Sequence, residues 1–118
     1  MLKKDRLPDW FEYPPEFLRI IDLRLMNLDP WHILEGDMLE DRFNGISERF
    51  SDKCYIPFAY RSDNDDVACW SKEGGNEKVL VIHDFASSGW EQVKTYNSFW
   101  SWFKQTIEDM IEHEQPYR

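Results

Sequence analysis

The sequence has few of the residue patterns that mark catalytic sites. It contains no Gly-x-Ser-x-Gly nucleophile elbow and no glycine-rich phosphate-binding loop. Its three histidines are scattered, and neither His-x-x-x-His nor Cys-x-x-Cys spacing occurs, so a zinc site has little support. These absences favour a protein that is not an enzyme and that has no cofactor and no metal. A small enzyme is the weakest alternative.

Long apolar stretches are also absent. No run approaches the roughly 18 apolar residues of a membrane-spanning helix. No apolar segment follows the N-terminal Met-Leu-Lys-Lys, as a secretory leader would require. We therefore expect a cytoplasmic protein whose two cysteines, Cys54 and Cys69, are reduced and pack as small apolar side chains. A disulfide between them is the alternative, because neighbouring strands can bring two cysteines together.

Positive charge is scarce. Asp and Glu number 23 against 14 Lys and Arg, which gives a net charge of -9. A field of that sign repels phosphate backbones and anionic lipids, so the charge argues against nucleic-acid and membrane-surface binding. The same field attracts a basic protein partner. The alternative explanation is that the acidic residues only keep the protein soluble.

Aromatic residues are abundant. Of the 118 residues, 42% are hydrophobic and 16% aromatic, with six Trp and eight Phe. Each buried aromatic contributes a large apolar area, so this composition predicts a packed core rather than disorder. The length fits one domain, over residues 1–118.

Residues 55–85 carry the pattern of an antiparallel meander, in which apolar runs alternate with polar, turn-forming links. We expect strands at Ile56–Tyr60, Val67–Trp70 and Val79–Phe85, and a fourth strand, Trp90–Tyr96, at an edge. Proline cannot donate to a strand ladder, so Pro57 predicts that the first strand is an edge or begins at the proline.

The strand Val79–Phe85 has apolar residues on both faces, which predicts a central strand that is covered on both sides. Leu80, Ile82 and Asp84 share one face, and Val79, Val81 and His83 share the other. His83 and Asp84 therefore cannot form a dyad with each other. We expect His83 to be a packed or hydrogen-bonded strand residue.

Three helices are expected, at about Pro15–Leu25, Asp37–Phe50 and Ser98–Glu114. Asp37 is a candidate N-cap, with Glu40 completing a capping box. Asn97 or Ser98 is expected to cap the last helix. The run Trp31–Leu34 is either a brief strand or a loop that plugs the core.

The acidic turn Asp63-Asn64-Asp65-Asp66 is the most unusual surface feature. It does not match an EF-hand, because Ala68 stands where the loop needs glycine and Gly74 where it needs glutamate. A turn stabilised by Asx side chains, an exposed recognition patch and a metal site are the three interpretations, in decreasing order of support.

The candidate partner-binding residues combine charge with aromatic surface. We expect Asp63, Asp65, Asp66 and Glu91 to provide the charge, and Trp70 and Trp90 to act as anchors. For Trp90, as for Trp31, core packing is the alternative and has more support than an anchor role.

Several runs resemble the SUKH superfamily of SMI/KNR type, named after fungal regulators of cell-wall synthesis. They are Leu7-Pro8, Pro30–Leu34, Tyr55–Ala59, Val67–Trp70, Val79–His83 and the helix containing Phe99, Trp102 and Phe103. The similarity extends from about Leu7 to Ile111, its motifs are structural rather than catalytic, and small bacterial members are the most similar. The chain departs from longer members in having little between the first helix and the Trp31 run.

The resemblance implies an α+β fold, with a small, bent, mainly antiparallel sheet of about four to six strands and helices packed on it. It also implies a non-enzymatic immunity or antitoxin-like protein that neutralises a toxin by stoichiometric binding. An acidic inhibitor suits a basic nuclease toxin, because the nuclease must be basic to hold its phosphate substrate. A regulatory or scaffold module, as in the fungal members, is the alternative.

Overall fold

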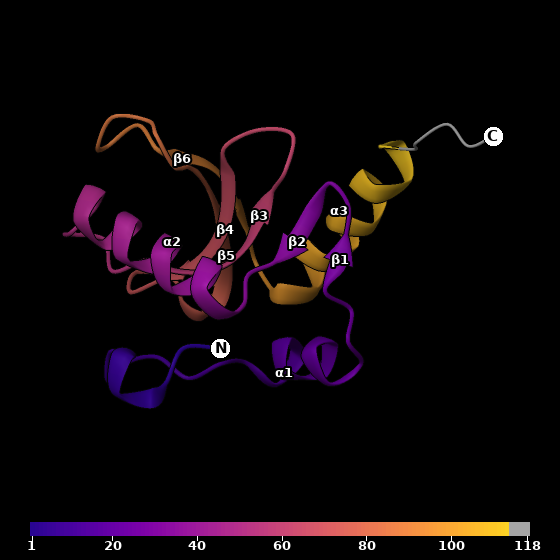
Figure 1. The fold of residues 1–118 in the computed structure, drawn as a ribbon. Coiled ribbons are helices and arrows are strands. Elements are labelled where there is room, and N and C mark those ends of the chain that lie inside the picture. Colours follow the sequence, from indigo (N-terminus) through magenta and orange to yellow (C-terminus); the bar gives the residue numbers. More distant parts are fainter. Residues whose placement is uncertain (114–118) are drawn as a thin grey trace.

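The computed structural model describes residues 1–113, which form helices packed on a six-stranded antiparallel sheet (Figure 1). The strands are β1 (Asn27–Leu28), β2 (Trp31–Ile33), β3 (Ile56–Arg61), β4 (Asp66–Ser71), β5 (Gly75–His83) and β6 (Gln92–Tyr96). The helices are a 3-10 turn η1 (Lys4–Arg6), α1 (Pro15–Asp22), α2 (Gly36–Arg49) and α3 (Phe99–Glu112). The predicted α+β class, a small antiparallel sheet with helices on it, is confirmed.

Spatial order in the sheet follows chain order from β1 to β6. Loops alone join most successive strands, because antiparallel neighbours need only a turn between them, whereas helix α2 lies between β2 and β3. The expected edge position of the fourth predicted strand is confirmed, although β6 begins at Gln92 rather than at Trp90. Trp31–Ile33 forms a strand, which decides between the two possibilities for that run.

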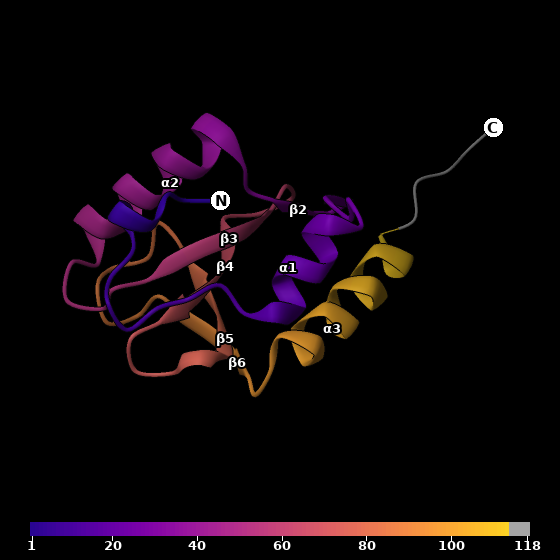
Figure 2. The same ribbon diagram turned by 90° about the horizontal axis from the view of Figure 1, so that it is seen from below.

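One face of the sheet carries an aromatic core. Phe58 and Trp70 stack there with ring centroids 4.3 Å apart, and Phe17 of α1 and Phe99 of α3 pack against them. Figure 2 shows α1 and α3 side by side, on the opposite side of the sheet from α2. Edge-to-face and stacked pairs of this kind add about 0.5–1.5 kcal/mol each beyond the area they bury.

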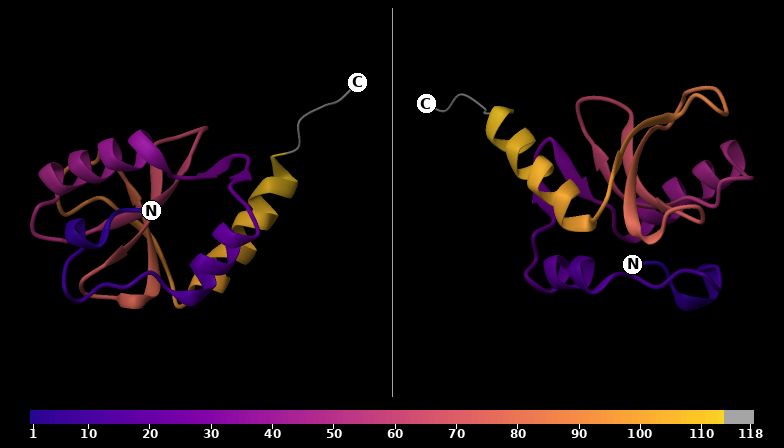
Figure 3. Two further views of the ribbon diagram at one scale, coloured as in Figure 1. Left: turned by 60° about the horizontal axis from the view of Figure 1, so that its bottom comes forward. Right: turned by 180° about the vertical axis from the view of Figure 1, so that it is seen from behind.

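The other face is covered by α2 (Figure 3). Ile46 of α2 and Phe50 pack there on residues from β4 and β5. Leu80 and Ile82 belong to this second core cluster, whereas Val79 and Val81 belong to the aromatic one. The prediction that the β5 strand is covered on both faces is therefore confirmed.

Several predicted element ends are wrong. Helix α2 begins at Gly36, with Glu35 as N-cap and no side-chain cap, so the capping box of Asp37 and Glu40 does not form. Gly36 has φ +59°, a left-handed value that favours glycine. Helix α1 ends at Asp22 instead of Leu25.

The last helix is confirmed with Ser98 as its cap, since the Ser98 hydroxyl accepts a hydrogen bond from the Ser101 N–H at 3.1 Å. The apolar residues of this helix differ in burial: Phe99 and Trp102 are buried, but Ile111 is 65% exposed. The predicted end of the helix, Glu114, lies outside the described residues.

Pro57 is not in an edge strand, because β3 lies between β2 and β4. Strand β2 pairs only with Ala59–Arg61 of β3, whereas Pro57 pairs with Cys69 of β4. The proline thus sits near the start of the strand, where β3 has a ladder partner on one side only. Its missing N–H therefore breaks no pairing with β2.

Both cysteines are free, and Cys69 is buried within β4 as expected. The expectation that Cys54 packs as a small apolar side chain is wrong, because it is exposed and precedes β3. Within residues 1–113, no helix has the length and apolar character needed to cross a membrane.

Candidate functional site

The loop from Asp84 to Glu91, called here the aromatic loop, joins β5 to β6 and carries two strongly exposed aromatic side chains. Trp90 is 82% exposed and Phe85 is 65% exposed. Aromatic residues are enriched at protein interfaces, and Trp in particular often acts as an anchor there.

The acidic turn, Asp63 to Asp66, projects from the same end of the sheet as the aromatic loop (Figure 1). One hydrogen bond joins the two segments, and a second joins the acidic turn to the last residue of β5. The Asp84 N–H donates to the Asp65 carbonyl oxygen at 3.1 Å, and His83 Nδ1 lies 3.1 Å from Asp66 Oδ1. The acidic turn and the aromatic loop therefore lie at the same end of the sheet and are joined through their backbones.

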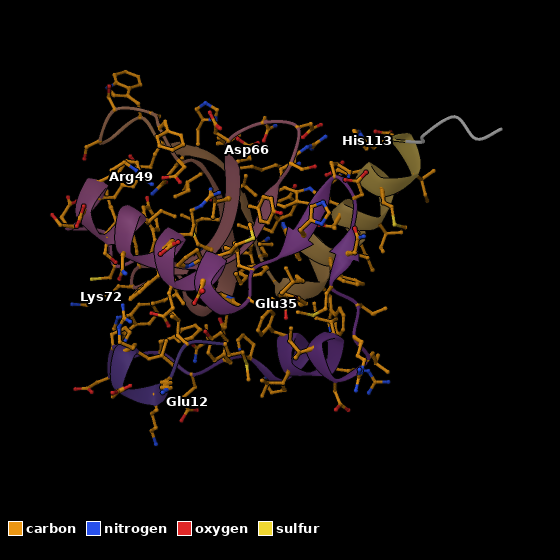
Figure 4. The ribbon with its side chains drawn as sticks, in the orientation of Figure 1. Glu12, Glu35, Arg49, Asp66, Lys72 and His113 are labelled. Carbon is orange, nitrogen blue, oxygen red and sulfur yellow. The ribbon has the colours of Figure 1, made fainter. Side chains whose placement is uncertain are left out.

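Asp84, at the start of the aromatic loop, is fully buried and paired with two arginines of α2. Arg42 Nη1 donates to Asp84 Oδ2 at 3.2 Å, and Arg49 donates to Oδ1 through Nε at 3.0 Å and Nη2 at 2.5 Å. Figure 4 shows Arg49 on the side of α2 that faces the loop. A buried carboxylate needs such partners, because an unpaired charge in the interior is costly.

Glu91, at the end of the aromatic loop, is also buried, with 1% of its surface exposed. Its carboxylate accepts hydrogen bonds from the Tyr55 hydroxyl at 2.5 Å and from the Gly89 N–H at 2.7 Å. Its backbone carbonyl accepts from the His83 N–H at 2.7 Å. Both ends of the aromatic loop are thus fixed by a buried carboxylate.

The protonation states of Glu91 and Tyr55 follow from these contacts. Burial alone would raise the pKa of Glu91, but the hydrogen bonds from Tyr55 and from backbone N–H groups outweigh it, so this pKa lies below its ordinary value. Burial, and then the bond to Glu91, raise the pKa of Tyr55 well above its ordinary value of 10.0. Near neutral pH, Glu91 is ionised and Tyr55 keeps its proton.

One predicted anchor, Trp70, and one predicted surface charge, Glu91, are wrong. Trp70 is completely buried in the aromatic core, and Glu91 is buried between Tyr55 and Gly89, so neither side chain is available to a partner. Trp31 is 4% exposed, so it packs in the core. Trp90 is on the surface.

The acidic turn is held by its own residues. The Asn64 side chain accepts from the Asp66 N–H at 2.8 Å, which is the Asx-stabilised turn expected from the sequence. Asp63 accepts from Arg61 Nε at 2.7 Å, and this hydrogen bond lowers the pKa of Asp63. Asp65 is exposed. Across residues 1–113, no group of three His, Cys, Asp or Glu side chains is placed to hold a metal ion.

Phe85 and the two arginines of α2 were not among the sequence candidates. Phe85 follows β5 instead of ending it, and the Arg49 guanidinium lies 4.7 Å from its ring centroid. Met38 and Phe85 line a shallow hollow of about 310 Å³ between α2 and the loop. One sequence signal pointed to the arginines: Asp84 shares a face with Leu80 and Ile82, and a carboxylate on an apolar face requires a cation.

The His83 and Asp84 side chains have different partners on opposite faces of the sheet. His83 contacts Asp66, whereas Asp84 contacts the arginines on the other face, so the His83–Asp84 pair forms no dyad, as predicted. Comparison of the chain with protein-family models, with curated proteins and with solved structures found no match.

Proposed function

We propose that this chain is a non-enzymatic protein-binding domain that captures a basic partner through the surface formed by the acidic turn and the aromatic loop. One observation carries the proposal. Trp90 and Phe85 stand exposed on a loop that buried carboxylates fix at both ends, at the same end of the sheet as three aspartates.

The two kinds of side chain have different tasks. Trp90 and Phe85 provide apolar area that a partner pocket can desolvate, and such residues dominate binding energy in most interfaces. Asp63, Asp65 and Asp66, together with the net charge of -9, accelerate encounter with a basic surface and disfavour acidic competitors. A basic nuclease toxin has the complementary charge.

The biological role we propose is that of an immunity or antitoxin-like protein of the SMI/KNR type, acting in the cytoplasm. The sequence resemblance to that family supports this role, and the acidic, aromatic surface supports capture of a basic toxin. Stoichiometric binding would block the toxin without any reaction by this chain.

The test starts with affinity capture of the partner from native cells, followed by calorimetric titration of the purified partner. We expect Trp90→Ala to weaken binding at least about tenfold, as loss of a hot spot does. Ile111→Ala is the matched control, because Ile111 is 65% exposed on α3 and lies outside the surface. Equal affinities for both variants would contradict the proposal.

A cell assay separates the proposed role from its alternative. Co-expression of the chain should protect cells from the captured toxin, and Trp90→Ala should reduce that protection. Binding without protection would instead indicate a regulatory or scaffold module.

A further inference from the structure

Strand β6 forms one outer edge of the sheet, and its only sheet neighbour is β5. Gln92 to Thr95 are all exposed, and Val93 is 57% exposed. In the view from behind in Figure 3, β6 runs from the aromatic loop to the start of α3. Alternate residues of an edge strand turn their backbone N–H and C=O groups away from the sheet, which makes the edge a template for another strand.

An acidic cavity lies where β6 runs into α3. It has a volume of about 410 Å³, and its lining includes Glu12, Glu16 and Glu77, with Tyr13 in the wall and Ser98 beside them. None of the lining residues, all of which belong to the described part of the chain, is Lys or Arg. Figure 4 labels Glu12 on the segment before α1, below the sheet. The cavity therefore suits a cationic side chain.

We propose that an extended, basic segment of the protein partner pairs with the outer edge of β6 and places a Lys or Arg side chain in this acidic cavity. The inference rests on the proposed function and specifies how the partner binds. The five residues of β6 span about 17 Å. Trp90 lies just before one end of that span, and Asn97, a lining residue of the cavity, follows the other.

Charge identifies the occupant as a basic partner rather than a second copy of the chain. Antiparallel pairing of β6 with itself about its central residue would place Lys94 opposite Lys94 of the other copy, and like charges directly opposite each other are destabilising. Each copy would also bring a net charge of -9. In the free chain the Lys94 ammonium lies 4.9 Å from the ring centroid of Tyr96 on the same strand.

The experiment selects random twelve-residue peptides displayed on phage against the full chain. We expect enriched peptides to alternate β-branched residues and to carry a Lys or Arg near one end. A synthetic copy of the enriched peptide should slow hydrogen exchange of β6 amides, measured by NMR. Absence of enrichment, or enriched peptides that leave β6 exchange unchanged, would overturn the proposal.

Two proline variants form a matched pair. Neighbouring residues of a strand point their backbone N–H groups to opposite sides. Of the two variants Thr95→Pro and Lys94→Pro, one therefore removes an N–H that points to β5, and the other removes an N–H that points away from the sheet. The variant whose melting temperature stays closer to that of the unchanged chain identifies the outward position, and we expect it to abolish peptide binding. Full binding by that folded variant would contradict strand pairing.

The cavity has its own variant. Glu12→Gln, Glu16→Gln and Glu77→Gln combined should weaken the basic peptide about tenfold or more. The control is a second triple variant of exposed glutamates on α2 and α3, namely Glu48→Gln, Glu108→Gln and Glu112→Gln. It changes the net charge by the same amount and should have a much smaller effect on binding. Equal losses in the two triple variants would show that only overall charge matters and would overturn the assignment of the cavity.

Failure of this inference is distinguishable from failure of the proposed function. A captured partner that depends on Trp90 but is unaffected by the β6 and cavity variants contradicts only the strand-pairing inference. Peptides that pair with β6, together with a captured partner unaffected by changes at the aromatic loop and acidic turn, contradict the proposed binding surface instead.

Discussion

Two groups of carboxylates lie within one end of this molecule and have opposite environments. Asp84 and Glu91 are buried and each is bound by two different residues. Asp63 and Asp65 lie exposed on a turn at the same end, and the third aspartate of that turn, Asp66, is partly exposed and paired with His83. The buried group fixes the position of the aromatic loop, whereas the exposed group contributes charge to the surface. Side chains of the same chemistry therefore have separable effects on stability and on binding.

The largest expected effect on stability comes from Asp84. Asp84→Ala leaves Arg42 and Arg49 without their shared carboxylate, and we expect the free energy of unfolding to fall by about 3 kcal/mol. Both arginine side chains are partly exposed, so the expected loss of stability is at the lower end of the range for a broken buried ion pair. Urea denaturation measures this loss. Asp65→Ala, at an exposed site, should change stability by less than about 0.5 kcal/mol. Similar values for both variants would remove the distinction between the groups.

A smaller loss is expected at the other end of the aromatic loop. Tyr55→Phe leaves one oxygen of the buried Glu91 carboxylate without its hydroxyl donor, which should cost about 2 kcal/mol. Glu91→Gln keeps an acceptor for the Tyr55 hydroxyl and should cost less. If Tyr55→Phe unfolds at the same urea concentration as the unchanged chain, the hydrogen bond does not stabilise the loop.

Alkaline pH should reveal the same contact. Because the pKa of Tyr55 is higher in the folded chain than its ordinary value of 10.0, its contribution to stability is complete below pH 10 and is lost as the pH rises above it. At pH 11 the loss attributable to Tyr55 should be about 1 kcal/mol, allowing for partial solvent screening. Thermal unfolding of Tyr55→Phe across the same range should lack this component. Parallel pH curves for the two proteins would contradict it.

The smallest expected effect on stability is in the acidic turn. Reversal of Asp63, Asp65 and Asp66 to Lys should change the free energy of unfolding by no more than about 1 kcal/mol, because the ion pairs there are partly exposed. The same triple variant should bind a basic partner more weakly and with a weaker dependence on salt. Unchanged affinity in the folded variant would exclude the acidic turn from the binding surface.

The sequence predicted the framework well because strand and helix patterns are local. Alternation along Val79–Ile82 predicted which side chains face each core, and apolar residues at helical spacing predicted the last helix and its start. Helix ends were less accurate. Asp37 and Glu40 have the spacing of a capping box, but the chain enters α2 one residue earlier, at a glycine with positive φ.

Burial of individual polar residues could not be predicted from the same patterns. Glu91 was expected to contribute surface charge, but the fold brings the Tyr55 hydroxyl, 36 residues away, to its carboxylate. Trp70 could be an anchor or a core residue on sequence grounds, and the rings that surround it come from α1, α3 and β3. Such contacts depend on long-range packing rather than on local spacing.

The fixed ends of the aromatic loop also affect the entropy of association. A loop that had to be ordered by its partner would lose backbone freedom of about 1–2 kcal/mol for each residue immobilised. Here Asp84 and Glu91 hold both ends before any partner arrives, so binding mainly restricts the Phe85 and Trp90 side chains, at about 0.5–1.5 kcal/mol each. Variants that release either end should therefore weaken binding even where every contact residue is unchanged.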